Sequence, residues 1–213
     1  MPAQPPLSQI RGWFDAVVAL GLGIKDREAG AHNLRVARLC VHIGRQMSMS
    51  ATELRVLARA GLMHDVGKLG IPDSVLDKHA PLDESEWLLV RTHPEIGLSM
   101  LDRAGPGRSS RALLAVLYHH ERMDGSGYPY GLKAEAIPIE ARIVAVADTY
   151  DALTSDRPYR DACSATEARR VLVEEARTRL DPRAVGALFT ALDLNRVGPD
   201  DPRSGSPRAA LAF

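Results

Sequence analysis

The chain has 213 residues, enough for one large domain or two small ones with a sizeable core. Lys plus Arg and Asp plus Glu number 27 each, so the net charge argues neither for nor against nucleic acid. No run approaches the ~18 apolar residues of a membrane-spanning helix, and MPAQPPLSQIRGW lacks the basic start and apolar stretch of a signal peptide. We therefore expect a soluble cytoplasmic protein without a membrane partner, and no feature of the sequence calls for a nucleic acid polymer as a partner.

The only two cysteines, Cys40 and Cys163, stand in apolar stretches that look helical. Thiols in such contexts are typically buried and inert. Their spacing supports neither a CxxC metal motif nor a disulfide framework. We expect two buried free thiols.

Helix-start signals recur along the chain, whereas we find no internal repeat and no strong strand-like alternation. SATE occurs at 50–53 and again at 164–167, and each predicts a capping box in which Ser accepts from an early backbone N–H and Glu reaches back. DESE at 83–86 fits the same pattern, and Asp181-Pro182 reads as an N-cap followed by proline at the first helical position. We expect helices near residues 7–20, 30–48, 51–66, 84–92, 95–103, 110–120, 138–153, 165–179 and 182–193.

These elements predict one all-α domain. Residues 1–24 would form an N-terminal helix of that domain, and 25–194 its main body. The tail at 195–213 contains GPDDPRSGSPR, a polar composition rich in Pro, Gly and Ser that predicts disorder. Two loops have a distinctive composition, at 67–82 and 121–137.

The stretch HHERMDGSGYP, at 119–129, places two adjacent imidazoles before a turn. Gly125 and Gly127 free the backbone and Pro129 stiffens it, so the turn has a defined shape. The remaining charged residues of the turn are expected to hold the loop in place: Glu121, Arg122 and Asp124.

Histidines and aspartates fall near helix ends or inside an apolar helix. His64-Asp65 lies near the end of the third helix, and His93 ends a helix before Pro94. Asp148 sits within IVAVADTYDAL, where an unpaired buried charge would be costly unless a cation lay beside it. The alternative is that Asp148 faces outward on a polar stripe. Five histidines and two aspartates share these settings: His32, His64, Asp65, His93, His119, His120 and Asp148.

Imidazole and carboxylate are ligand types that hold first-row transition metals. A carboxylate has two oxygens, so Asp65 can bridge two ions. Two ions about 3.5–4 Å apart can hold a hydroxide between them as the nucleophile and stabilise both the entering and leaving oxygens at phosphorus. A single histidine is more often a surface or hydrogen-bonded core residue, so the indication comes from the whole set.

The order H…HD…H…HH…D, with HDVGK and HHERMDGSGYP, resembles the HD-GYP branch of the HD-domain phosphohydrolases. The resemblance covers roughly residues 25–185 and includes LMHDVGKLGIPDSVL, His93-Pro94 with Gly97, and VADTYDALTSDRPYR. It implies a single helical HD-domain bundle with a metal centre in its core. That centre would hydrolyse cyclic di-GMP, a bacterial second messenger, to linear pGpG and in some members to GMP. The cofactors would be two or three divalent transition-metal ions, with iron or manganese favoured.

The resemblance also implies roles for matching residues. The metal ligands would be His32, His64, Asp65, His93, His119, His120 and Asp148. Lys68 would lie beside the catalytic Asp65 and contact the scissile phosphate. Tyr128 would line the guanine or ribose side, and Arg157 and Arg160 would contact the other phosphate of the ring. Without the resemblance, Lys68 reads as a surface lysine and the two arginines as solvated charges.

Glu28 raises the question of a third metal. It precedes His32 by four residues, a spacing that puts both side chains on one helix face. Members of the family with a glutamate at the position of Glu28 resemble the members that hold three metal ions. The alternative is a first-turn glutamate that interacts with the helix dipole. Ala29 and Ala31 depart from the family's usual threonine and glycine.

Three functions remain open. The first is a metal-dependent cyclic dinucleotide phosphodiesterase, which the complete ligand set favours. The second is a module that binds cyclic di-GMP or a partner protein without turnover. The third is another HD-type enzyme, acting on nucleotide monophosphates or using a di-iron centre for oxygen chemistry; the GYP turn and the arginine pair count against it. Only about 25 residues precede the motif region, so regulation is expected from a separate protein, a homodimer or transcription.

Overall fold

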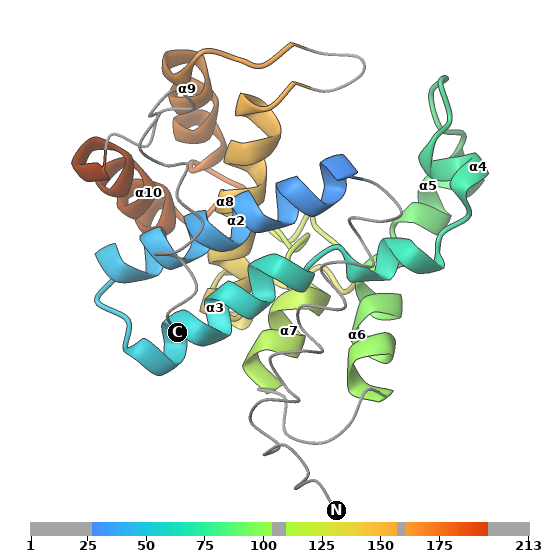
Figure 1. Cartoon of the computed structure of the whole chain (residues 1–213), viewed down its shortest axis with the longest axis horizontal. Coiled ribbons are helices and arrows are strands. Elements are labelled where there is room, and N and C mark those ends of the chain that lie inside the picture. The colour runs from blue at the N-terminus through green and yellow to red at the C-terminus, as the bar shows by residue number, and fades with distance from the viewer. Residues whose placement is uncertain (1–26, 104–109, 157–160, 196–213) are drawn as a thin grey trace, which may run out of the picture.

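The structure is a computed structural model that describes residues 27–103, 110–156 and 161–195. Every regular element within these ranges is a helix, which confirms the all-α prediction (Figure 1). The α-helices are α2 (Arg27–Gln46), α3 (Ala51–Met63), α4 (Asp73–Leu76), α5 (Glu84–Val90), α6 (His93–Arg103), α7 (Ser110–Tyr118), α8 (Ile139–Thr154), α9 (Ala165–Glu175) and α10 (Pro182–Asn195). Two short 3-10 helices, η1 (Val66–Gly70) and η2 (Ala134–Ala136), complete the set.

Helix α8 is the centre of the bundle. Its residues 140–147 are all buried, and it packs against α2, α3, α7, α9 and α10. A helix that is buried all round belongs to the core of a domain. The main core cluster joins Val36 of α2, Leu57 of α3, Val144 of α8 and Leu188 of α10. Helices α4 and α5 lie at the opposite end of the molecule from α10 (Figure 1).

The helix-start signals are found at the predicted positions. Ser50 and Asp83 each form a complete capping box, with Glu53 and Glu86 respectively. Ser164 caps α9 by accepting from a backbone N–H, which is one half of the predicted box. At the fourth signal, α10 begins with Pro182, as predicted.

Several predicted helix boundaries were wrong by up to four residues, and two of these errors affect the placing of His64, Asp65 and His93. His93 does not end a helix; it is the first residue of α6, and α5 ends three residues earlier at Val90. Pro94 is tolerated there because the first turn of a helix does not need its N–H. Helix α3 stops at Met63 and does not continue to 66, so His64 and Asp65 occupy a turn before η1.

The segment predicted as a loop at 67–82 is partly helical, since it holds most of η1 and all of α4. Its start packs tightly on α6: an added Cβ at Gly67 would lie 1.8 Å from the carbonyl oxygen of His93. Only glycine allows two backbones to approach so closely. This contact brings the turn that carries Asp65 against the start of α6.

Some predictions fall outside the described residues, namely the helix at 7–20 and the tail beyond Asn195. Within the described ranges, no helix combines the length and apolar character that crossing a bilayer would require. Both cysteines are free; Cys40 is buried as predicted, whereas Cys163 is only half-buried.

Candidate metal centre

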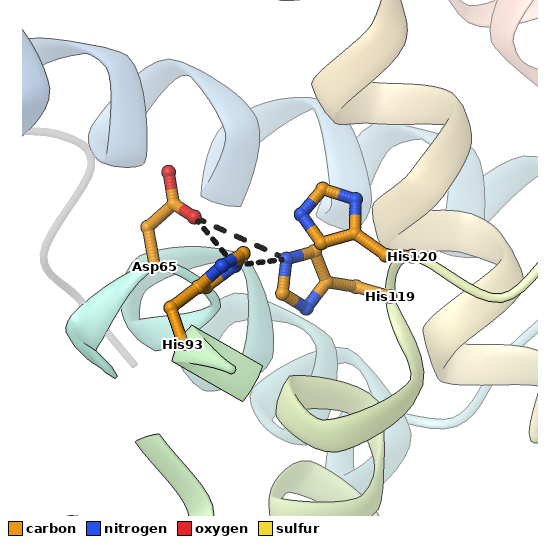
Figure 2. Close-up of side chains that lie close together, drawn as sticks. All are labelled: Asp65, His93, His119 and His120. Atoms are coloured by element: carbon orange, nitrogen blue, oxygen red, sulfur yellow. Dashed lines mark hydrogen bonds and ion pairs between the residues drawn. The ribbon is translucent and has the colours of Figure 1, made fainter. Parts of the chain in front are cut away.

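Two clusters of potential metal ligands lie side by side where α2, α3, α6, α7 and α8 meet. The ligand atoms within each cluster are all within 4.8 Å of one another. The first cluster, shown in Figure 2, consists of Asp65, His93, His119 and His120. The second cluster consists of His32, His64 and Asp148. The structure therefore brings together seven of the eight ligands predicted from the sequence.

Asp65 lies between the two clusters. Its Oδ1 is 3.4 Å from His93 Nε2 and 3.9 Å from His119 Nε2. Its Oδ2 is 3.5 Å from His64 Nε2 and 4.0 Å from His32 Nε2. One carboxylate thus directs one oxygen to each cluster, which is the arrangement expected of a ligand that bridges two ions.

Three of the histidine rings are fixed by backbone carbonyls at helix ends. Nδ1 of His64, His93 and His119 donates to the carbonyl three residues earlier, at 2.9, 2.8 and 2.7 Å respectively. The last carbonyls of a helix have no partner within it, so they are available for these bonds. A carbonyl only accepts, so Nδ1 carries the proton and Nε2 of a neutral ring keeps a lone pair.

The Nε2 lone pairs of these histidines point toward one another, and no hydrogen-bond donor of the described ranges lies between them. The Nε2 atoms of His93 and His119 are 3.3 Å apart, and the buried Nε2 of His64 has no hydrogen-bond partner among the described residues. Burial, then the neighbouring His120, holds the pKa of His119 well below 6.5, and burial lowers the pKa of His64. Neutral imidazoles and a carboxylate that converge in this way are a donor set suited to iron, manganese or zinc. The residues present therefore fit a metal ion.

In the second cluster, His32 is supported by a side chain and not by a backbone carbonyl. His32 Nε2 is 3.3 Å from Asp148 Oδ1, while His32 Nδ1 is 2.7 Å from Oδ2 of Asp151. Burial lowers the pKa of His32, but hydrogen bonds to Asp148 and Asp151 outweigh it and raise the pKa to about 9. Asp148 thus points toward the histidines and does not belong to an outward-facing polar stripe of α8.

Lys68 returns to Asp65, as its spacing of three residues predicts. Its Nζ lies 2.6 Å from Asp65 Oδ2, and 40% of its side chain is exposed. The ammonium group is therefore at the edge of the centre, where an anion arriving from solvent can contact it.

The GYP turn folds back onto His120. Gly125 has a φ of +83°, a left-handed conformation that favours glycine. The N–H of Tyr128 donates to the carbonyl of His120 at 3.2 Å, and the two rings stack with centroids 4.7 Å apart. Burial raises the pKa of Tyr128, so its phenol stays protonated beside the first cluster.

Buried Glu121 fixes the rest of this turn. It accepts hydrogen bonds from the N–H groups of Tyr130 at 2.8 Å and Leu132 at 3.0 Å. Asp124 accepts from the N–H of Ser126 at 2.8 Å. The loop-holding role predicted for Glu121 and Asp124 is confirmed.

Two residues at the centre were not predicted from the sequence. Asp151 contacts His32, and its position three residues after Asp148 on a helix was the available signal. Arg91 lies over the ring of Tyr128, with its guanidinium carbon 4.6 Å from the ring centroid. Nothing in the local sequence indicates this contact, because it joins the end of α5 to a turn far along the chain.

Three predicted site residues are not placed by the described structure. Arg157 and Arg160 lie outside the described ranges. Glu28 belongs to the first turn of α2, but its side chain is outside the description.

Comparisons with known proteins agree with this geometry. The family model described as HD domain matches residues 21–184. The chain is 42% identical over 172 residues to the cyclic di-GMP phosphodiesterase response regulator RpfG of Xanthomonas campestris, covering 81% of this chain and 46% of that protein. It is 35% identical over 196 residues to 3'3'-cGAMP-specific phosphodiesterase 3 of Vibrio cholerae, covering 91% of this chain and 42% of that protein.

A solved structure, that of the V. cholerae cyclic GMP-AMP specific phosphodiesterase V-cGAP3, has a TM-score of 0.54 and 32% identity, covering 84% of this chain and 40% of that chain. The chain thus spans less than half the length of these relatives. The match to the family model extends over most of the described bundle and includes both ligand clusters. The family recognised from the HD and GYP motifs is therefore confirmed: the chain belongs to the HD domain family.

Proposed function

We propose that the protein is a metal-dependent phosphodiesterase that hydrolyses cyclic di-GMP to linear pGpG, with GMP as a further product. The observation that carries the proposal is the position of Asp65, which directs one carboxylate oxygen to each ligand cluster. Two ions joined in this way suit displacement at a phosphodiester. The names of the relatives, which specify cyclic di-GMP and 3'3'-cGAMP, support a cyclic dinucleotide as the substrate class.

The two clusters would hold one divalent ion each, with Asp65 shared between them. Bound ions would lower the pKa of water and offset the negative charge that develops on the phosphoryl oxygens. Imidazole and carboxylate ligands favour iron or manganese, although zinc suits the same donors. Glu28 would serve a third ion beside His32.

The chain's own side chains would position the substrate. Lys68 lies 2.6 Å from Asp65, so its ammonium can reach a phosphate that contacts the ions. Tyr128 would line the base or ribose side, since it stacks on His120 and keeps its phenolic proton. Arg157 and Arg160 would contact the second phosphate, because paired guanidinium groups suit phosphate recognition.

A cytoplasmic location is part of the same proposal. The reducing cytoplasm keeps thiols free, and Cys40 and Cys163 are both free thiols.

The test is anaerobic purification with metal analysis, followed by incubation with cyclic di-GMP and, separately, 3'3'-cGAMP. Chromatography of the products should show linear pGpG from the iron- or manganese-loaded protein. Faster hydrolysis of 3'3'-cGAMP than of cyclic di-GMP would support the proposed phosphodiesterase reaction but show that 3'3'-cGAMP is the preferred substrate. The absence of any linear product from a fully metallated sample would overturn the proposal in favour of a module that binds without turnover.

Matched variants make this test specific. His93→Ala removes a residue of the first cluster and should abolish turnover. His79→Ala removes a histidine that belongs to neither cluster and should leave turnover unchanged. Equal activity of the two variants would contradict the assignment of the centre.

A further inference from the structure

We propose that Asp151 is a positioning residue that fixes the ring of His32 for the ion of the second cluster, and that Arg35 holds Asp151 in place. The inference rests on the metal centre of the proposed function. It requires metal binding but does not require that cyclic di-GMP be the substrate.

The contact between Asp151 and His32 sets the orientation of the imidazole. Asp151 is 3% exposed, and its Oδ2 lies 2.7 Å from His32 Nδ1. A carboxylate accepts, so Nδ1 is the donor and Nε2 is the atom left for a ligand bond. Nε2 points toward the centre, 3.3 Å from Asp148 Oδ1. A hydrogen bond behind a metal-binding histidine fixes both its tautomer and its ring orientation.

Arg35 holds the same carboxylate from a second direction. Its Nε is 2.6 Å from Asp151 Oδ1, and its Nη2 is 3.0 Å from Oδ2. Such two-point pairing fixes the plane of a carboxylate as well as its position. It also balances the buried negative charge, which would be costly if unpaired.

Helical spacing explains why these residues meet. On α2, Arg35 follows His32 by three residues, and on α8, Asp151 follows Asp148 by three, so each pair shares a helix face. The two helices pack against each other. His32 therefore contacts both Asp148 and Asp151, whereas Arg35 contacts Asp151. These contacts join α2 to α8 at two successive helical turns.

His32 needs such a partner because of its place in the chain. The histidines at 64, 93 and 119 follow helix ends and use carbonyls that the helices leave unpaired. His32 lies inside α2, where the preceding carbonyls accept helical hydrogen bonds. A side-chain acceptor from another helix takes over the same role.

The competing explanation is that Asp151 and Arg35 form a structural ion pair that happens to touch a histidine. Asp181 provides a matched control for that possibility. It is 1% exposed, and its Oδ2 lies 2.8 Å from Arg142 Nη1 and 3.2 Å from Arg183 Nη2. It belongs to neither ligand cluster. Removing it tests the loss of a buried carboxylate–arginine pair, together with the cap hydrogen bond from the Arg183 N–H, at a site outside the clusters.

The experiment compares Asp151→Ala, Asp151→Asn and Asp181→Ala with the wild type. Metal-free protein is titrated with Mn²⁺ by calorimetry, bound metal is counted after gel filtration, and thermal unfolding is followed in parallel. Asp151→Ala should weaken one ion by about 10- to 100-fold, the range for loss of a group behind a metal ligand, and leave the other ion bound. Asp151→Asn keeps an acceptor and should lose less. Asp181→Ala should lower the unfolding temperature and keep the wild-type Mn²⁺ affinity.

Nitrogen-detected NMR of the histidine rings provides a readout independent of metal. In metal-free protein kept at a pH above the His32 pKa of about 9, where the ring is neutral, the wild type should carry the single ring proton on Nδ1, and Asp151→Ala should shift that ring toward the other tautomer or a mixture. If Asp151→Ala fails to fold, Asp151→Asn decides by the same two measurements. Wild-type Mn²⁺ affinity in the Asp151 variants, or equal metal loss in Asp181→Ala, would overturn the inference. Failure to cleave cyclic di-GMP with an intact metal result would instead count only against the proposed function.

Discussion

The two ligand clusters are built in different ways. In the first cluster Asp65, His93 and His119 are buried, and the rings of His93 and His119 are held by backbone carbonyls. In the second cluster buried His64 is held in the same way by the carbonyl of Gly61, whereas His32 and Asp148 are half-buried and His32 is held by the side chain of Asp151. The carbonyl-held rings are thus fixed by the paths of the helices, and His32 by a contact between side chains. We expect an ion bound beside His32 to exchange more readily than one in the first cluster.

The largest effect should come from the one residue that joins the clusters. Removing the Asp65 carboxylate leaves two cations facing each other with no shared anion, so neither should stay bound. We expect Asp65→Ala to lose both ions together, and activity to fall by more than the roughly 10- to 100-fold typical of losing a group behind a ligand. Metal counting and turnover on the same sample provide the measurement. If Asp65→Ala kept two ions per chain, the bridging role would be wrong.

The backbone support of the first cluster can be broken without touching a ligand. An added Cβ at Gly67 would lie 1.8 Å from the carbonyl oxygen of His93 and 2.6 Å from the backbone nitrogen of Gly97. Overpacking costs about 1–3 kcal/mol, and the upper end applies here because backbone atoms cannot yield as side chains do. We expect Gly67→Ala to lower the free energy of unfolding by about 3 kcal/mol in urea denaturation, and to weaken the first ion before the second.

Gly186→Ala is the control for that substitution. Gly186 is on an exposed position of α10, and an added Cβ would meet no atom within 4 Å. Alanine is favoured over glycine in a helix by about 1 kcal/mol, so this variant should be slightly more stable and bind metal normally. A loss of stability in Gly186→Ala comparable to that of Gly67→Ala would contradict the packing argument.

The contrast between the clusters also explains what the sequence could reveal. Capping boxes mark helix starts locally, and the HD and HH pairs indicated four of the clustered residues, His64, Asp65, His119 and His120. The other three, His32, His93 and Asp148, entered the set through the resemblance to the HD-GYP pattern. The place of His93 was misjudged because Pro94 can begin a helix as well as follow one. Asp151 was not identified because its partner, His32, is 119 residues away, and only the packing of α2 on α8 brings them together.

Substrate contacts should be separable from both clusters. A charge-assisted hydrogen bond contributes roughly 1.5–3 kcal/mol, or about 10- to 150-fold in binding. We expect Arg157→Ala and Arg160→Ala each to raise KM for cyclic di-GMP by this factor, with metal content unchanged. Steady-state kinetics on samples of known metal content give the measurement. An unchanged KM in both variants would show that these arginines are solvated surface charges and do not contact the substrate.

The smallest effect concerns a third ion at the more open cluster. The two clusters would hold one ion each and make no use of Glu28. A third would need an additional anion, because cations within a few ångströms of one another repel strongly. Glu28 precedes His32 by one helical turn on α2, the spacing that puts two side chains on one face.

We therefore expect Glu28→Gln, which keeps the shape of the side chain and removes its charge, to lower the metal count by one at most. The first two ions and the fold should be unaffected, because a first-turn glutamate contributes only about 0.3–1 kcal/mol through the helix dipole. Metal counting at saturating Mn²⁺, alongside turnover, separates the two explanations: unchanged stoichiometry and turnover would leave Glu28 with the dipole role alone.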